Sequence, residues 1–183
     1  MTDLKAPFVE ARDRLDALVD GLPDDVFNAK PSAKGWSAAE CVVHLNRTAK
    51  GYMPYLEEAV ARTEPRGQGP FRYGWVGRRF IAAVTPGSRA IPTLPAMKPP
   101  SARGLRSDID RERALGRFDS DTDALLAIVD AADGLDLARV KVLEPFLPFF
   151  KLPLGVFIEV LGQHNLRHVL QAERAVADAR GAA

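Results

Sequence analysis

The C-terminal stretch from Leu152 to Arg180 constrains the fold more than any other part of this chain. Its residues repeat at helical spacing, and Pro153 suits the first turn of a helix because that position needs no backbone donor. The stretch therefore predicts a long helix that begins near Pro153. One continuous face of that helix would carry Phe157, Leu161, His164, His168, Gln171 and Ala175.

Two histidines on this face indicate a metal site. His164 and His168 are four residues apart, so both imidazoles leave the same side of a helix about one turn apart. On an apolar face an unpaired imidazole is costly unless it is hydrogen-bonded or ligated. The chain has three histidines in all, and His44 lies beside the apolar stripe of another expected helix. We therefore expect the three to meet across a helix–helix interface and bind one divalent ion, with coordination positions left open. The alternative is that they are ordinary polar residues. Unperturbed imidazoles would release a metal as the pH falls through about 6.5, because only the neutral form binds.

Periodicity predicts three further long helices. The first covers Leu4 to Asp20 and ends where Gly21 and Pro23 interrupt the pattern, with a short helical turn at 24–28. The second begins at Ser37, which with Glu40 fits a capping box, and fades near Arg62. Pro54 lies inside it and predicts a kink. The third runs from about Ser120 to Ala132, because acidic residues crowd that start.

The connections between these helices differ in character. Seven of the fourteen prolines fall in residues 63–107, which predicts a long crossover between the second and third helices. Within it, FRYGWVGRRFIAAV (71–84) is apolar enough to pack as a short helix. The crossover could either cover the bundle or act as a lid or binding segment. DLARVKVLEPFLPFF (136–150) is apolar and broken by prolines, which favours extended structure. The expected fold is all-α, a single four-helix-bundle domain over 1–183 with one long crossover.

Charge and cysteine content exclude several classes of function. The net charge is +1, so no overall field would attract nucleic acid or an anionic membrane. No apolar run of about 18 residues exists, so no membrane span is expected. The N-terminus lacks a signal-peptide pattern, and the single cysteine, Cys41, rules out an internal disulfide, so a cytoplasmic location is expected. Cys41 could be a fourth ligand or a nucleophile, but a small buried hydrophobe is the simpler interpretation.

Other residues are candidates for supporting roles. Glu40 lies one turn before His44 and could accept a hydrogen bond from a ligand or only cap its helix. Gln171 could orient a ligand or fill space, and Asn46 could contact substrate or mark a polar boundary. No catalytic residue is assigned, because the chain has no G-x-S-x-G motif and no phosphate-binding glycine loop. The aromatic residues Tyr52, Tyr55, Phe71, Tyr73 and Trp75 are expected in the core or its cover. The arginines Arg72, Arg78 and Arg79 are expected on a solvated face, or against an acidic thiol.

Two motifs resemble those of the DinB-like superfamily. They are WSAAECVVHLN, with its Trp-Ser entry and its His followed by Leu-Asn, and QHNLRHVLQ, with H-x-x-x-H followed by Gln. The resemblance covers nearly the whole chain in order and length, although 63–107 matches loosely. It implies a four-helix bundle with a divalent metal on His44, His164 and His168, and a homodimer, since members are often dimers. The family includes transferases and isomerases that use low-molecular-weight thiols such as bacillithiol or mycothiol, and many members have no known activity.

The expected function follows from this resemblance. A divalent ion, with zinc and nickel the expected metals, would activate a low-molecular-weight thiol for transfer to an electrophilic small molecule. One alternative is a metal-dependent hydrolase that uses metal-bound water. Another is a non-enzymatic bundle that binds a metal or a small ligand.

Overall fold

Helices dominate the structure. This computed structural model describes residues 3–64, 71–89, 92–100, 104–146 and 150–181. Apart from one small two-stranded sheet, the described elements are helical, which confirms the all-α prediction. In chain order they are α1 (Ala6–Val19), α2 (Asp24–Phe27), α3 (Ala38–Ala61), α4 (Trp75–Val84), η1 (Pro95–Met97), α5 (Arg111–Ala131), β1 (Lys141–Leu143), β2 (Lys151–Pro153) and α6 (Leu154–Gly181).

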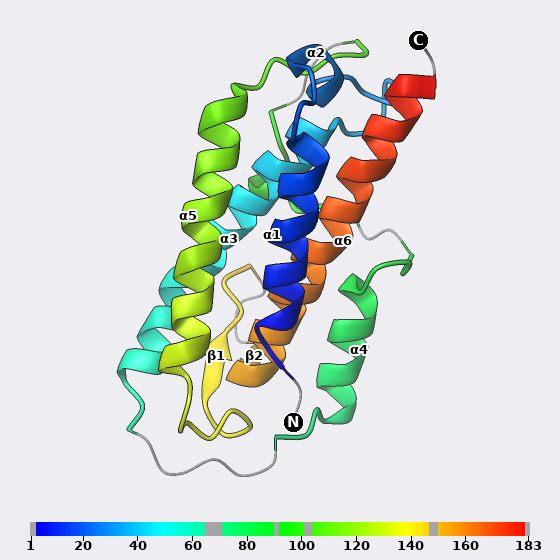
Figure 1. Ribbon diagram of the computed structural model, residues 1–183. Helices are drawn as coiled ribbons and strands as arrows, with labels where there is room; N and C mark the ends of the chain where they lie inside the picture. The colour runs from blue at the N-terminus through cyan, green and yellow to red at the C-terminus, as the bar shows by residue number, and fades with distance from the viewer. Residues whose placement is uncertain (1–2, 65–70, 90–91, 101–103, 147–149, 182–183) are drawn as a thin grey trace.

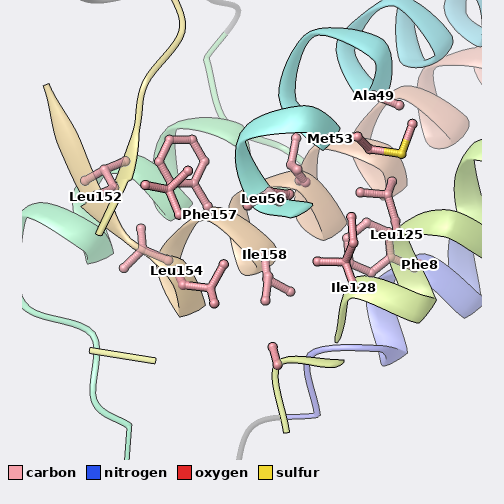
Figure 2. Close-up of a cluster of buried hydrophobic side chains, with 14 of the residues drawn as sticks. Phe8, Ala49, Met53, Leu56, Leu125, Ile128, Leu152, Leu154, Phe157 and Ile158 are labelled. Carbon is pink, nitrogen blue, oxygen red and sulfur yellow. The ribbon is translucent and has the colours of Figure 1, made fainter. Parts of the chain in front are cut away.

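The long helices α1, α3, α5 and α6 lie side by side (Figure 1). α3 packs against α5 and α6, and α1 packs against α6 and α5, so each helix has two neighbours within the set. Apolar residues from all four helices meet between them, as Figure 2 shows for one of the two buried clusters. That cluster includes Phe8 of α1, Leu56 of α3, Ile128 of α5, and Phe157 and Ile158 of α6, all buried.

The start of α3 agrees with the predicted capping box. The Ser37 hydroxyl accepts a hydrogen bond from the Glu40 amide at 3.1 Å, and the Glu40 carboxylate accepts one from the Ser37 amide at 2.9 Å. Both residues are buried, so these bonds satisfy backbone donors that water cannot reach. The helix then continues through Pro54 without interruption to Ala61. The capping box therefore fixes the direction in which α3 leaves its preceding loop.

The predicted start of the third long helix is wrong. α5 begins at Arg111 and not near Ser120. Asp110 is its N-cap, and its carboxylate accepts a hydrogen bond from the Arg113 amide at 2.9 Å. The acidic residues that suggested a later start lie inside the helix, where Asp121 is buried and pairs with Arg117 one turn earlier. This ion pair offsets the cost of burying the Asp121 carboxylate. Asp121 can therefore lie inside the helix and not at its N-terminus.

The crossover and the extended segment both follow the sequence predictions where they are described. α4 is the short helix expected within 71–84, and it packs on α6 (Figure 1). A Cβ at Gly77 would lie 2.7 Å from the Val156 side chain, so glycine is needed for this close approach. β1 lies in the apolar stretch 136–150 that was expected to be extended, and it pairs antiparallel with β2, just beyond that stretch, with Val142 opposite Leu152. Residues 65–70, 90–91, 101–103 and 147–149 of these predicted segments lie outside the described part.

No helix in the described ranges combines the length and apolarity needed to cross a lipid bilayer.

Candidate metal centre

The three histidines of the chain come together between α3 and α6. His44 projects from α3, and His164 and His168 project from α6. One ring nitrogen from each residue can be chosen so that all lie within 4.8 Å of one another, a group that could hold a metal ion. The Nε2 atoms of His44 and His164 are 3.2 Å apart. The predicted meeting of the three side chains across a helix–helix interface is thus present.

His44 is held in one orientation by the crossover. Its Nδ1 lies 2.8 Å from the backbone carbonyl oxygen of Met97 in η1. A carbonyl can only accept, so Nδ1–H is the donor and the neutral ring presents the lone pair of Nε2 to the other histidines. This arrangement of a hydrogen bond on one ring nitrogen and a free lone pair on the other is usual for metal-binding histidines. The sequence carried no signal for it, because the acceptor is a backbone atom far away in the chain.

The two histidines of α6 have nitrogen atoms that need a partner. The Nδ1 atoms of both His164 and His168 are buried and have no hydrogen-bond partner among the described residues. A buried polar atom without a partner is unfavourable, and coordination of an ion by these rings would offset that cost. Three imidazoles suit divalent ions such as zinc or nickel and leave further coordination positions for a ligand. The donor set therefore fits the group that the sequence predicts.

The environment keeps all three rings neutral. Burial, together with the smaller effects of the His44 and Arg167 charges, lowers the pKa of His164 to about 3. Burial also lowers the pKa of His168 well below its usual value, although hydrogen bonding with Gln171 opposes this. Burial lowers the pKa of His44 too, while the bond to Met97 acts against it. Neutral imidazole is the form that binds metal, so the rings are ready for coordination at neutral pH.

Trp36 forms a wall of the histidine cluster. Its ring centroid lies 5.0 Å from that of His44, and it stacks on His168 at 5.8 Å with an interplanar angle of 28°. Trp36 directly precedes Ser37, so the capping box that starts α3 also places this indole against the site. Trp36 belongs to the Trp-Ser pair of the first motif, and the structure shows that its ring covers the imidazoles of His44 and His168.

The histidines line a cavity of about 520 Å³. Thr48 and Tyr52 continue its wall along α3, and Arg167 and Gln171 line it from α6. The crossover supplies much of the remaining wall, which comprises Phe80, Ala83, Val84, Pro92, Thr93, Leu94 and Met97. The segment 63–107 thus lines the candidate site as well as covering the helices, which supports its interpretation as a binding segment.

Of the three residues considered for supporting roles, Glu40 and Asn46 do not line the cavity. The Glu40 carboxylate is engaged by the capping box and by buried Lys30 at 3.6 Å, and it does not line the cavity. Asn46 donates to the Ala114 carbonyl of α5 at 2.9 Å and ties the two helices together. Only Gln171 reaches the site, where it lines the cavity beside His168.

Cys41 is a buried residue of the core. Its side chain is 1% exposed, it is not part of the histidine group, and burial raises the pKa of its thiol. A protonated, enclosed thiol is a poor ligand and a poor nucleophile. This agrees with its interpretation as a small hydrophobe.

In the crossover, one aromatic residue differs from its expected position and three arginines agree with theirs. Trp75 was expected in the core or its cover, but it is 69% exposed with the Arg79 guanidinium over its ring. Arg72, Arg78 and Arg79 are exposed and none of them lines the cavity, as expected of a solvated face. Arg167 does line the cavity, and no sequence pattern marks it. Its guanidinium donates to the Ala83 carbonyl at 3.0 Å and to the Ser88 hydroxyl, so it holds the crossover on α6.

Comparison with known proteins identifies a family for this chain. A protein-family model described as the DinB superfamily matches residues 8–172, which is most of the chain. Neither the curated proteins nor the solved structures contain a significant match.

Proposed function

This chain belongs to the DinB superfamily, and from that membership we propose that it is a divalent-metal-dependent transferase that acts with a low-molecular-weight thiol. The observation that carries the proposal is the position of the three histidines. They form a three-nitrogen group that could hold an ion in the wall of a cavity, where a small molecule could reach it. A purely structural zinc site would normally be closed by four protein ligands.

The residues around the group support this chemistry. When bound, a divalent ion would lower the pKa of a thiol and hold its sulfur as the reactive thiolate. His44 is oriented for this by the Met97 carbonyl, and Trp36 covers the rings of His44 and His168. A volume of about 520 Å³ suits a small organic ligand, since such sites commonly measure about 300–1,000 Å³.

The charge distribution of the cavity favours a thiol over water as the nucleophile. Activation of water usually gains from a nearby general base. Among the described lining residues the only carboxylate is Glu144, which packs with Tyr52 two turns along α3 from His44. A thiol needs less help, because its ordinary pKa of about 8.5 already lies close to neutral.

Metal content and thiol ligation test the proposal together. Protein purified without an affinity tag and supplied with zinc or nickel should retain about one ion per chain by elemental analysis, as expected for one three-histidine group. The cobalt-substituted protein should then change its absorption spectrum when a small thiol is added, because sulfur coordination creates a new charge-transfer band. Retention of metal without any spectral response to thiols would instead indicate a hydrolase or a non-enzymatic binding protein. Protein that stays metal-free would refute the site itself.

A further inference from the structure

We propose that Tyr52 and Glu144 form a subsite that binds a positively charged, hydrogen-bond-donating group of the substrate, such as a primary ammonium, at the end of the cavity remote from the histidines. The inference rests on the proposed function, since it places the sulfur of the same ligand at the histidine end. It assigns a chemical class to the molecule: an elongated thiol with its cationic group away from the sulfur.

The first observation is the pair itself. The Tyr52 hydroxyl donates to Oε1 of Glu144 at 2.6 Å, and the Phe146 amide donates to Oε2 at 2.8 Å. Glu144 is only 5% exposed, yet both it and Tyr52 line the cavity. These bonds fix the carboxylate in place, and a carboxylate oxygen that already accepts one hydrogen bond can accept a second one from a ligand. The pair is therefore a rigid, buried acceptor site that faces the cavity.

The second observation is the separation of this pair from the histidines. His44, Thr48 and Tyr52 follow one another at intervals of four residues, so they lie along one side of α3, and all three line the cavity. Eight residues of α-helix span about 12 Å along its axis. The wall between the two ends includes the apolar side chains of Val160 and Leu161 from α6. A molecule that touches both ends must therefore be extended and largely apolar in its middle.

The third observation is the charge of the lining residues. In the described part of the cavity wall the charged side chains are Lys34, Arg167 and Glu144. Arg167 neighbours His168 in sequence, and Lys34 lies two residues before Trp36, so both cations belong to the histidine end. The Arg167 guanidinium is bound by neutral carbonyl and hydroxyl groups, which do not cancel its charge. The cavity is thus positive at the histidine end and negative at the other, a polarity that favours thiolate at one end and ammonium at the other.

A purely structural pair would behave differently. If Tyr52 and Glu144 only anchor the β1–β2 hairpin to α3, their loss would lower stability without changing which ligand charge is preferred. A comparison of ligands that differ only in terminal charge separates the two roles, because it can be made on the native protein.

The test uses cobalt-loaded protein and straight-chain thiols of equal length that end in an ammonium, a methyl or a carboxylate group. The thiolate–cobalt absorption band reports binding, and the comparison is repeated over a series of chain lengths. At the length that spans the cavity, the ammonium thiol should bind about tenfold more tightly than the methyl thiol, as expected for a charge-assisted hydrogen bond. The carboxylate thiol should bind more weakly than both.

Matched variants test whether Glu144 causes the preference for the ammonium thiol. Glu144→Gln keeps the shape and an acceptor for Tyr52, and it should remove the preference, so that the ammonium thiol binds no more tightly than the methyl thiol to the same variant. Glu57→Gln, at an exposed position of α3, should keep the full preference. Equal binding of the three thiols to native protein would overturn this inference and leave the proposed function standing. Absence of the band with every thiol would overturn both.

Discussion

Loss of His44 should uncouple metal binding from the stability of the fold. His44 belongs to α3, and His164 and His168 belong to α6, so an ion held by all three ties together helices far apart in sequence. A ligand that binds only the folded state stabilises it by mass action. We therefore expect added metal to raise the melting temperature of the native protein and to have little effect on His44→Ala, in which both remaining histidines belong to one helix.

The size of the effect can be worked out from the ligand excess and the chain length. At a hundredfold excess of metal over its dissociation constant the gain is about 2.7 kcal/mol. For a chain of 183 residues, 1 kcal/mol shifts the melting temperature by about 2–4 °C, so the expected rise is roughly 5–11 °C. The apoprotein should still be folded, because the apolar clusters between the four long helices do not depend on the histidines.

The pH dependence follows from the lowered pKa values and differs from the expectation for unperturbed histidines. His164 has a pKa of about 3 in the folded protein, against about 6.5 when unfolded. As the pH falls below about 6.5 the unfolded chain takes up a proton that the folded chain does not. The apoprotein therefore loses about 2 kcal/mol between pH 8 and pH 5 from this residue alone. Metal binding by the folded state should weaken less between pH 8 and pH 5 than unperturbed histidines would allow, because the pKa of each of the three rings is lowered.

Thermal melts with and without metal at pH 8 and pH 5 test the metal-dependent rise and its pH dependence. The native protein should melt lower at pH 5 than at pH 8 yet show a metal-dependent rise at each. An undiminished rise in His44→Ala would show that the ion does not bridge α3 and α6. Disappearance of the rise in native protein at pH 5 would mean that the folded state does not hold its histidines neutral.

Three further substitutions probe the core, the cap and the crossover. Cys41→Ala should keep both the metal and its stabilising effect, since the thiol is buried outside the histidine group; loss of metal from the folded variant, by elemental analysis, would make Cys41 a ligand. Ser37→Ala should cost about 1 kcal/mol in denaturant unfolding, because the Glu40 amide loses its acceptor; an unchanged midpoint would contradict the cap. Gly77→Ala should cost about 1–3 kcal/mol, because the new methyl meets Val156; a neutral result would show that α4 packs less closely on α6.

Local sequence patterns predicted several structural features of this protein. The four-residue spacing of His164 and His168 placed them on one helix face, and the three-residue spacing of Ser37 and Glu40 located the start of α3. Such features involve neighbours in the chain, so the sequence contains them directly. The start of α5 was missed because several acidic residues could have capped it, and only packing shows which are buried inside the helix.

Residue order and spacing alone predicted the helical class, the meeting of the three histidines across a helix–helix interface, and the short helix of the crossover. Contacts between segments distant in sequence determined the hydrogen bonds, the cavity lining and the pKa shifts of the candidate site. The carbonyl that orients His44 comes from Met97, and the carboxylate in the cavity wall comes from Glu144, which directly follows β1. The lowered pKa values of the histidines arise from burial by several elements at once. Hydrogen bonds to backbone atoms, enclosed volume and desolvation depend on how the chain packs in space, and residue identities alone carry little trace of them.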